Sequence, residues 1–231
     1  MTHTATGEQQ PSSLDVLTAE AGVLRRELAA LPAAHWELPT GCAPWSVREL
    51  FGHIHVVLGW LPRMLDAAPS GPAKVGPREY YRPDGRFAPG TNEQRIALAV
   101  DHAARHDNAA LLAQFARLVD GVVARCAAEP PGRTVQTRHG DVMALDDFLA
   151  TRVVEVAVHG LDLALALDRA PWTTAAAGEL VLDVLVGRVL PPAALGWDAT
   201  TFLLKVTGRV PLRAGEQDQL DAAGIVRPSL G

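Results

Sequence analysis

Apolar residues recur every three or four positions through four long stretches of this chain, which is the period of an amphipathic helix. The stretches cover residues 13–31, 47 to about 64–66, 93–128 and a segment that ends at Asp168. Gly59 and Pro62 are expected to bend or shorten the second helix, because both residues weaken a helix interior. Four substantial helices are the content of a bundle, so the pattern predicts a mostly α fold.

Local signals mark the ends of several elements. Ser46 and Glu49 form the pattern of a capping box at the start of the second helix. Asp146 is in position to cap the fourth helix. Between the third and fourth helices, RTVQTRHGDVMALDDF has β-type residues on both sides of His139-Gly140, which predicts a short hairpin.

Two regions depart from the four-helix pattern. Residues 69–90 are rich in proline and glycine, which predicts a long loop of the kind that often serves as a lid or binding segment. The C-terminal region predicts one helix over residues 175–190 and a shorter one over 200–206, with Asp198 as its cap.

The charge balance excludes two classes of partner. The formal net charge is −5 at pH 7 and Lys and Arg form no cluster, whereas binding to nucleic acid or a membrane surface needs such a cluster. Cys42 and Cys126 are too few for a disulfide framework. The N-terminus is polar and no apolar stretch reaches membrane-spanning length, so we expect a soluble, cytoplasmic protein.

The fourth helix carries a polar stripe that calls for an explanation. Its sequence TRVVEVAVHGLDLALALD is apolar almost all the way round, yet Arg152, Glu155, His159 and Asp162 fall on one face at about 100° per residue. Glu155 and His159 are one turn apart, so a carboxylate oxygen and an imidazole nitrogen can converge on a divalent metal such as zinc. The alternative is a solvated face on which Arg152 and Glu155 form a surface ion pair.

A complete site needs a third ligand, and several histidines are available. His53 and His55, in GHIH of the second helix, point to nearly opposite sides, so only one can serve, and periodicity does not decide which. His102 and His106 form a rival pair four residues apart, but DHAARHDN is polar over most of its length. We interpret that segment as a solvated face.

Two segments resemble a known family. PTGCAPWSVRELFGHI is similar to a helix-entry motif that precedes a metal-binding histidine, and RVVEVAVHGLDLALAL is similar to a partner motif with Glu and His four apart. Together they resemble the mycothiol-dependent maleylpyruvate isomerase family, within the DinB-like superfamily of four-helix bundles. The resemblance covers about residues 14–168 and continues more faintly into DATTFLLKVTGR.

The resemblance implies a fold class and a division of the chain. The expected fold is a DinB-like four-helix bundle with a short hairpin and a small helical C-terminal extension. Residues 1–12 are expected to be a disordered tail, residues 13–168 the metal-binding bundle, and residues 169–231 an extension packed on the bundle.

The resemblance also implies a ligand set and a reaction. Carried over by position, the ligands are His53, Glu155 and His159, which leaves His55 without a metal role. Three protein ligands leave one position of the metal, expected to be zinc, open for chemistry. Because the family uses mycothiol as cosubstrate, we expect a metal-bound thiolate to attack a small electrophile, giving S-transfer or cis–trans isomerisation. A hydrolase with metal-activated water and a non-enzymatic binding bundle remain alternatives.

Three further residues receive predicted roles. Asp162 is expected to orient His159 through its second ring nitrogen. Arg209, in VTGRVPL, is expected to act in catalysis by clamping a substrate carboxylate, and Arg152 is expected to contact the thiol cofactor. The expected partners are therefore a small thiol and a small electrophile, with pairing into a homodimer left open.

Overall fold

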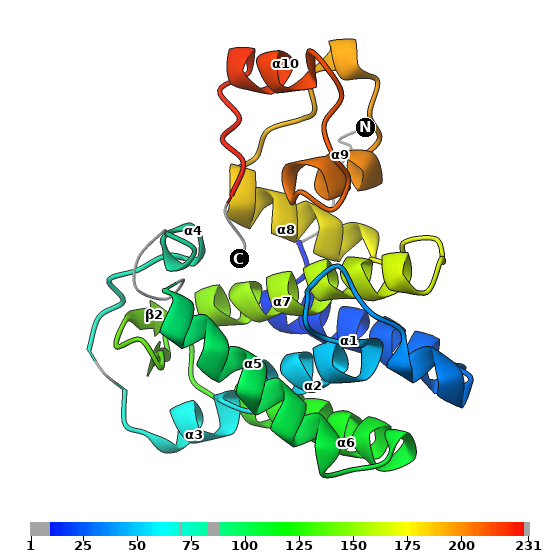
Figure 1. Ribbon diagram of the computed structural model, residues 1–231. Helices are drawn as coiled ribbons and strands as arrows, with labels where there is room; N and C mark the ends of the chain where they lie inside the picture. Colours follow the sequence, from blue (N-terminus) through cyan, green and yellow to red (C-terminus); the bar gives the residue numbers. More distant parts are fainter. Residues whose placement is uncertain (1–9, 70, 83–87, 229–231) are drawn as a thin grey trace, which may run out of the picture.

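The protein is built almost entirely of helices (Figure 1). The structure, a computed structural model, describes residues 10–69, 71–82 and 88–228. The mostly α fold predicted from the sequence is confirmed. The helices are α1 (Ser13–Ala29), α2 (Val47–Leu58), α3 (Leu61–Asp66), α4 (Pro77–Tyr80), α5 (Pro89–Ala104), α6 (Asn108–Ala127), α7 (Leu145–Ala166), α8 (Ala175–Val186), α9 (Ala199–Val206) and α10 (Glu216–Ala222), with short 3-10 turns at Ala33–Glu37 and Ala193–Leu195.

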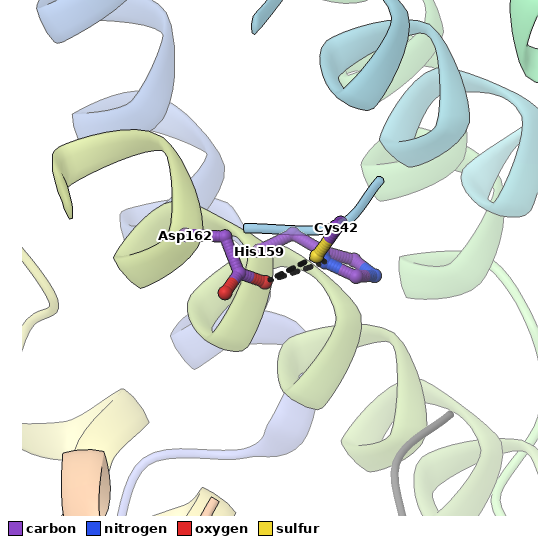
Figure 2. A group of neighbouring side chains, drawn as sticks. All are labelled: Cys42, His159 and Asp162. Carbon is purple, nitrogen blue, oxygen red and sulfur yellow. Dashed lines mark hydrogen bonds and ion pairs between the residues drawn. The ribbon is translucent and has the colours of Figure 1, made fainter. Parts of the chain in front are cut away.

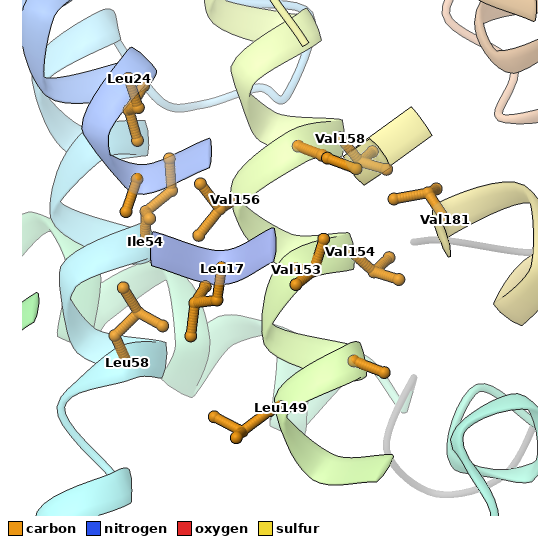
Figure 3. Close-up of a cluster of buried hydrophobic side chains, with 14 of the residues drawn as sticks. Leu17, Leu24, Ile54, Leu58, Leu149, Val153, Val154, Val156, Val158 and Val181 are labelled. Carbon is orange, nitrogen blue, oxygen red and sulfur yellow. The ribbon is translucent and has the colours of Figure 1, made fainter. Parts of the chain in front are cut away.

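Helix α7 lies in the middle of the molecule and packs against α1, α2 and α8 (Figure 1). Figure 3 shows Leu17 of α1 and Ile54 of α2 on one side of α7, and Val181 of α8 on the other. Val153 and Val156 of α7 are fully buried between them. A helix with neighbours on several sides must be apolar nearly all round, which explains the composition of this segment.

Helices α2 and α5 approach each other closely at Gly52. A Cβ atom at this position would lie 2.8 Å from the carbonyl oxygen of Ala99 and 3.2 Å from the Cβ of Ala103. The first distance is shorter than any normal contact, so only glycine allows the two backbones to come this near. The contact fixes the rotation of α2 about its axis and therefore the directions in which its histidines point.

Two predicted helices are each divided in the structure. The predicted helix over 93–128 is wrong as a single element, because α5 ends at Ala104 and Asp107 caps a new helix, accepting a hydrogen bond from the amide of Ala110 at 2.7 Å. The predicted helix over 47–66 separates at Gly59 into α2 and α3, as the glycine and the nearby Pro62 suggested. Both breaks fall where a residue suited to a helix end occurs.

The predicted caps are confirmed in two cases and wrong in one. Ser46 and Glu49 form the capping box of α2, and Asp198 caps α9. Asp146 does not cap α7, which starts after Ala144 without a side-chain cap. Its carboxylate instead accepts a hydrogen bond from the amide of Ser13, at 3.2 Å, and so ties α7 to the start of α1.

The hairpin is present as predicted, and the loop before α5 is only partly irregular. Strands β1 (Thr134–Gln136) and β2 (Val142–Ala144) pair antiparallel, with Val135 opposite Met143. In the described part of the predicted 69–90 loop, α4 forms one short helix and α5 begins at Pro89, one residue before the predicted end of the loop.

The C-terminal region is helical, with α8 packed against α7 and α1, and α9 packed against α8. Helix α10 was not predicted, and α8 ends at Val186, four residues before the predicted end. Of the predicted disordered tail 1–12, only residues 10–12 belong to the described part. Within the described ranges, no helix combines the length and the apolar character that a bilayer span requires.

Candidate metal centre

His53, Glu155 and His159 come together from two helices that are far apart in the sequence. His53 lies on α2, and Glu155 and His159 lie one turn apart on α7. His53 is only 3% exposed, and its ring is stacked on that of Trp45 with the two centroids 4.7 Å apart. The structure thus brings together the three residues that the family resemblance implied as ligands, and His55 is not among them.

The three side chains are spaced as metal ligands would be. The Nε2 atom of His53 lies 3.3 Å from Oε2 of Glu155, and Nε2 of His159 lies 3.5 Å from the same oxygen. One ligand atom from each residue lies within 4.8 Å of the others. Ligands about 2.1 Å from a tetrahedral zinc ion are separated by about 3.4 Å, so the donor set and its spacing fit such an ion.

The electrostatics of the cluster favour a positive charge beside Glu155. Burial disfavours ionisation of Glu155, but hydrogen bonds with His159 and His53 outweigh it and hold the pKa of this carboxyl well below its usual value. Burial lowers the pKa of His53 to about 4, so this imidazole is neutral and can offer a lone pair. Hydrogen bonds with Asp162, Cys42 and Glu155 overcome burial at His159 and raise its pKa well above the usual range.

Asp162 joins His159 to the C-terminal region. Its Oδ2 lies 3.0 Å from Nδ1 of His159, which fits the predicted orienting contact. The same carboxylate accepts two hydrogen bonds from Arg209, from Nε and Nη2, each at 2.9 Å. The Cys42 thiol lies 3.2 Å from Oδ2 and completes the group (Figure 2). Burial disfavours ionisation of Asp162, but the contacts with His159 and Arg209 outweigh it and hold the pKa of this carboxyl well below its usual value.

Cys42, His159 and Asp162 form a second group that could in principle hold a metal. Arg209 already neutralises the Asp162 carboxylate through two parallel hydrogen bonds, and a metal there would have to displace that cation. In the described part of the chain, the guanidinium contact of Glu155 is looser than that of Asp162, with Nη2 of Arg152 3.8 Å from Oε1. We therefore favour the His53–Glu155–His159 group as the metal centre.

Arg152 is placed differently from its predicted role. The residue is fully buried and its guanidinium lies 4.7 Å from the centre of the Phe148 ring. It donates to Oγ1 of Thr151 at 3.2 Å and faces Glu155 from within the core. Because Arg152 does not line the cavity above the cluster, its position gives no support to a contact with the thiol cofactor. The position favours an internal counter-charge for Glu155 instead.

The cluster lies in the wall of a cavity of about 330 Å³. Arg209 lines this cavity. Its Nε and Nη2 atoms bind Asp162, and Nη1 donates to the carbonyl of Thr207 at 2.8 Å. The edge of the guanidinium with two parallel N–H groups, which would bind a substrate carboxylate, is therefore already occupied by Asp162. Other lining residues were not assigned to the site individually from the sequence, because they come from loops, α4, the hairpin and the start of α5, where no periodic pattern marks a common face. They are Cys42, Trp60, Tyr80, Tyr81, Asn92, Arg95, Arg138 and His139.

Both the sequence and the fold of this chain match known proteins. Residues 17–164 match the mycothiol maleylpyruvate isomerase N-terminal domain. A crystal structure of the mycothiol-dependent maleylpyruvate isomerase superposes with a TM-score of 0.51 at 15% identity, over 74% of this chain and 65% of that one. A histidine-to-alanine mutant of that enzyme gives 0.53 at 14% identity, with the same coverage of 74% and 65%.

These two structures are similar to this chain in fold, and the chain spans 65% of their length. A search of curated proteins gives no match. The matched domain ends at residue 164, after the last of the three clustered residues, so the whole cluster lies inside it.

Proposed function

Because the chain belongs to the mycothiol maleylpyruvate isomerase family, we propose that it is an enzyme that uses mycothiol to transform a small electrophile. The observation that carries the proposal is the meeting of His53, Glu155 and His159, within 4.8 Å of one another, in the wall of a cavity. Two imidazoles and one carboxylate form a donor set suited to zinc, with one position left for a ligand. The structures of the mycothiol-dependent enzyme share the fold that carries this cluster.

A divalent metal in this position would supply a positive charge that lowers the pKa of a thiol bound at its open position. The chain's own residues prepare that position. Glu155 provides the single negative charge of the donor set, and Arg152 balances it from the core side. Asp162 holds Nδ1 of His159, which directs Nε2 toward Glu155 and the cavity.

The cavity can also shield the reaction from water. His53, Trp45 and Val57 form part of one wall, and Val154 and Val158 of α7 form part of another. Apolar surroundings strengthen the electrostatic effect of nearby charges on a bound thiol. Transfer of the thiol to the substrate and cis–trans isomerisation through a reversible adduct both fit this arrangement, and we propose an activity of one of these two kinds.

Cobalt-substituted protein offers a direct test. Added mycothiol is expected to produce a sulfur-to-metal charge-transfer band in wild-type protein and none in His53→Ala. Cys42→Ser is the matched control, since it removes the protein thiol nearest the cluster, and its band is expected to persist. If mycothiol leaves the wild-type spectrum unchanged, the proposal of a metal-bound thiol is wrong.

The division into a bundle of residues 13–168 and an extension of 169–231 stays a prediction, and so does the cytoplasmic location. Whether the chain forms a homodimer stays open. Zinc is likewise our proposal for the native metal. Elemental analysis of protein purified without added metal tests that identity, and a sample dominated by another divalent ion would contradict it.

A further inference from the structure

Cys42, His159 and Asp162 form a compact group around the second nitrogen of the His159 ring (Figure 2). The Sγ atom of Cys42 lies 3.2 Å from Oδ2 of Asp162 and 4.0 Å from Nδ1 of His159. Oδ2 lies 3.0 Å from Nδ1. Glu155 is at the other ring nitrogen, Nε2. The single imidazole of His159 therefore belongs to two groups of possible metal ligands, through different nitrogens.

The sulfur, nitrogen and oxygen atoms of this group are spaced as ligands of one cation. A cation midway between Sγ and Nδ1 would lie about 2 Å from each of them and about 2.4 Å from Oδ2, two bonding distances and one slightly longer. A sulfur and a nitrogen ligand are about 3.5 Å apart in a tetrahedral site and about 4.3 Å apart on opposite sides of an ion. The observed 4.0 Å lies between these values. Such a wide angle suits a cation with few ligands, such as Cu⁺.

The types of donor atom and their charges favour a soft, monovalent ion. Thiolate sulfur selects soft cations such as Cu⁺. When the cation takes the place of the thiol proton, Cys42 and Asp162 are both negative, and Arg209 balances only one of them. A monovalent ion neutralises the remaining charge, whereas a divalent ion would leave an uncompensated positive charge at a largely buried carboxylate. A divalent ion would also be repelled by a metal at Nε2 of the same ring.

Arg209 does not prevent an ion of this kind from binding. Its Nε and Nη2 atoms donate to Oδ1 and Oδ2 of Asp162. A carboxylate oxygen has lone pairs for more than one partner, and an ion bonded mainly to Sγ and Nδ1 needs only a weak contact with Oδ2. A hard divalent ion would bond to the carboxylate first and would compete with the guanidinium.

The group can be reached from the cavity. Cys42 carries a free thiol, is half-buried and lines the cavity together with His159. Asp162 lies behind them and is only 5% exposed. A cation that arrives through the cavity therefore meets the sulfur and the imidazole first, and the carboxylate then supports it from the protein side.

We propose that Cys42, Asp162 and Nδ1 of His159 form a second cation site, for a soft monovalent ion of the Cu⁺ class, that shares the His159 imidazole with the candidate metal centre. The site goes beyond the proposed function and does not depend on it. An ion at Nδ1 replaces the hydrogen bond between His159 and Asp162, so its binding changes the donor strength of Nε2 and inhibits chemistry at the centre.

An anaerobic titration of the zinc-loaded full chain against the Cu⁺ complex of bicinchoninate, a coloured chelator, measures the affinity. Wild type is expected to take up one Cu⁺ ion per chain. Cys42→Ser is expected to weaken this binding about 100-fold or more, because the soft ligand is lost while the size of the side chain is kept. Cys126→Ser is the matched control, since Cys126 is a free, buried cysteine on α6, and it is expected to bind Cu⁺ as wild type does.

Three results of the titration would overturn the proposal: no uptake by wild type, equal affinity of Cys42→Ser and wild type, or the same loss in Cys126→Ser. X-ray absorption at the copper edge of wild type is a second measurement that needs no variant. It is expected to show one sulfur ligand together with lighter nitrogen or oxygen ligands. A shell of sulfur alone would also overturn the proposal.

Cobalt at the candidate metal centre reports whether His159 is shared. Added Cu⁺ is expected to shift the visible bands of the cobalt protein without releasing cobalt, and to leave them unchanged in Cys42→Ser. Release of cobalt, or Cu⁺ uptake that leaves the bands of wild type unchanged, would contradict a shared imidazole. A sulfur-to-cobalt band that depends on Cys42 in the absence of mycothiol would contradict the selectivity for a monovalent ion.

Failure of this proposal is distinguishable from failure of the proposed function. A mycothiol band in the cobalt protein without Cys42-dependent uptake of Cu⁺ would keep the thiol chemistry and remove the second site. Cys42-dependent uptake of Cu⁺ without a mycothiol band would do the reverse.

Discussion

The molecule contains two groups of histidines, one on each side of α2, and they differ in what surrounds them. His53 meets Glu155 and His159, while His55 meets His102 and His106. The rings of His55 and His102 lie 4.2 Å apart, and those of His102 and His106 lie 5.7 Å apart. We refer to His55, His102 and His106 as the interhelical histidines. Both groups contain histidines, yet among the described residues only the first combines its histidines with a carboxylate at a spacing that suits a metal.

The carboxylates near the interhelical histidines bind other groups of the protein. Asp101 pairs with Arg105 at 2.6 Å, and Asp107 caps α6. The Nδ1 atom of His55 and the Nε2 atom of His102 are buried without a hydrogen-bond partner in the described part of the chain. His102 therefore does not lie on a fully solvated face, as the sequence suggested, but packs on His55. The comparison indicates that a carboxylate in contact with two histidines is a stronger signal for a candidate metal site than the spacing between histidines alone.

The largest expected effect separates His53 from His55. His53→Ala removes one of three ligands and is expected to weaken metal binding on the order of 1,000-fold, with loss of activity, because a ligand contributes more than its supporting contacts. His55→Ala, two residues away on the same helix, is the matched control and is expected to keep its metal. Elemental analysis after dialysis against a chelator measures both. Retention of metal by His53→Ala would contradict the ligand assignment.

A smaller loss of metal affinity is expected when the contact between Asp162 and His159 is removed. Asp162→Asn keeps the size of the side chain but removes the charge that Nδ1 of His159 and Arg209 share. Loss of such a supporting contact typically costs about 10- to 100-fold in metal affinity. Chelator competition measures the change, and an affinity equal to that of wild type would show that Asp162 plays no part in orienting the ligand.

The interhelical histidines are expected to control stability in acid. Burial first, and then the charges of His102 and His106, lower the pKa of His55 to about 3. The unfolded chain takes up this proton below about pH 6.5 while the folded chain does not, so stability falls as pH decreases through this window. The expected loss is about 2 kcal/mol between pH 7 and pH 5. His55→Phe is expected to remove this part of the acid dependence in urea unfolding at the two pH values, and an unchanged dependence would contradict it.

The smallest expected effect concerns Cys42. Cys42→Ser replaces one donor to Asp162 by another, so metal affinity is expected to change less than about threefold. Chelator competition on the same preparation as Asp162→Asn gives the comparison. A loss as large as that of Asp162→Asn would mean that the thiol itself contributes to holding the metal.

The sequence was informative where an element depends on local chemistry. The capping box at Ser46 and the cap at Asp198 need only neighbouring residues, and both are present. The break before α6 had a local signal as well, since Asp107 is a favourable N-cap residue. We predicted one continuous helix because the helical period continues on both sides of the break. Asp146 was mispredicted because a distant partner, the amide of Ser13, decides where its carboxylate points.

For the site, the sequence could indicate the three clustered residues but not their environment. The polar stripe on α7 predicted that Glu155 and His159 share a face, and the family resemblance selected His53. The burial of Arg152 could not be predicted, because a polar stripe on a helix is equally compatible with a solvated face and with a buried site. Only the positions of α2 and α4, which both contact Arg152, decide between the two. The meeting of Arg138 and Trp60 depends on two loops whose positions follow from tertiary packing alone.

The contact between Arg209 and Asp162 has a consequence for the segment that follows α9. This segment reaches the imidazole of His159 through one carboxylate, so we expect its attachment and metal binding at the cluster to favour each other, with the same coupling free energy in both directions. Metal loading would therefore slow protease cutting around residues 207–213, and a chelator would speed it. Sequence changes in this stretch would then alter metal affinity from a distance while leaving the three proposed ligands unchanged.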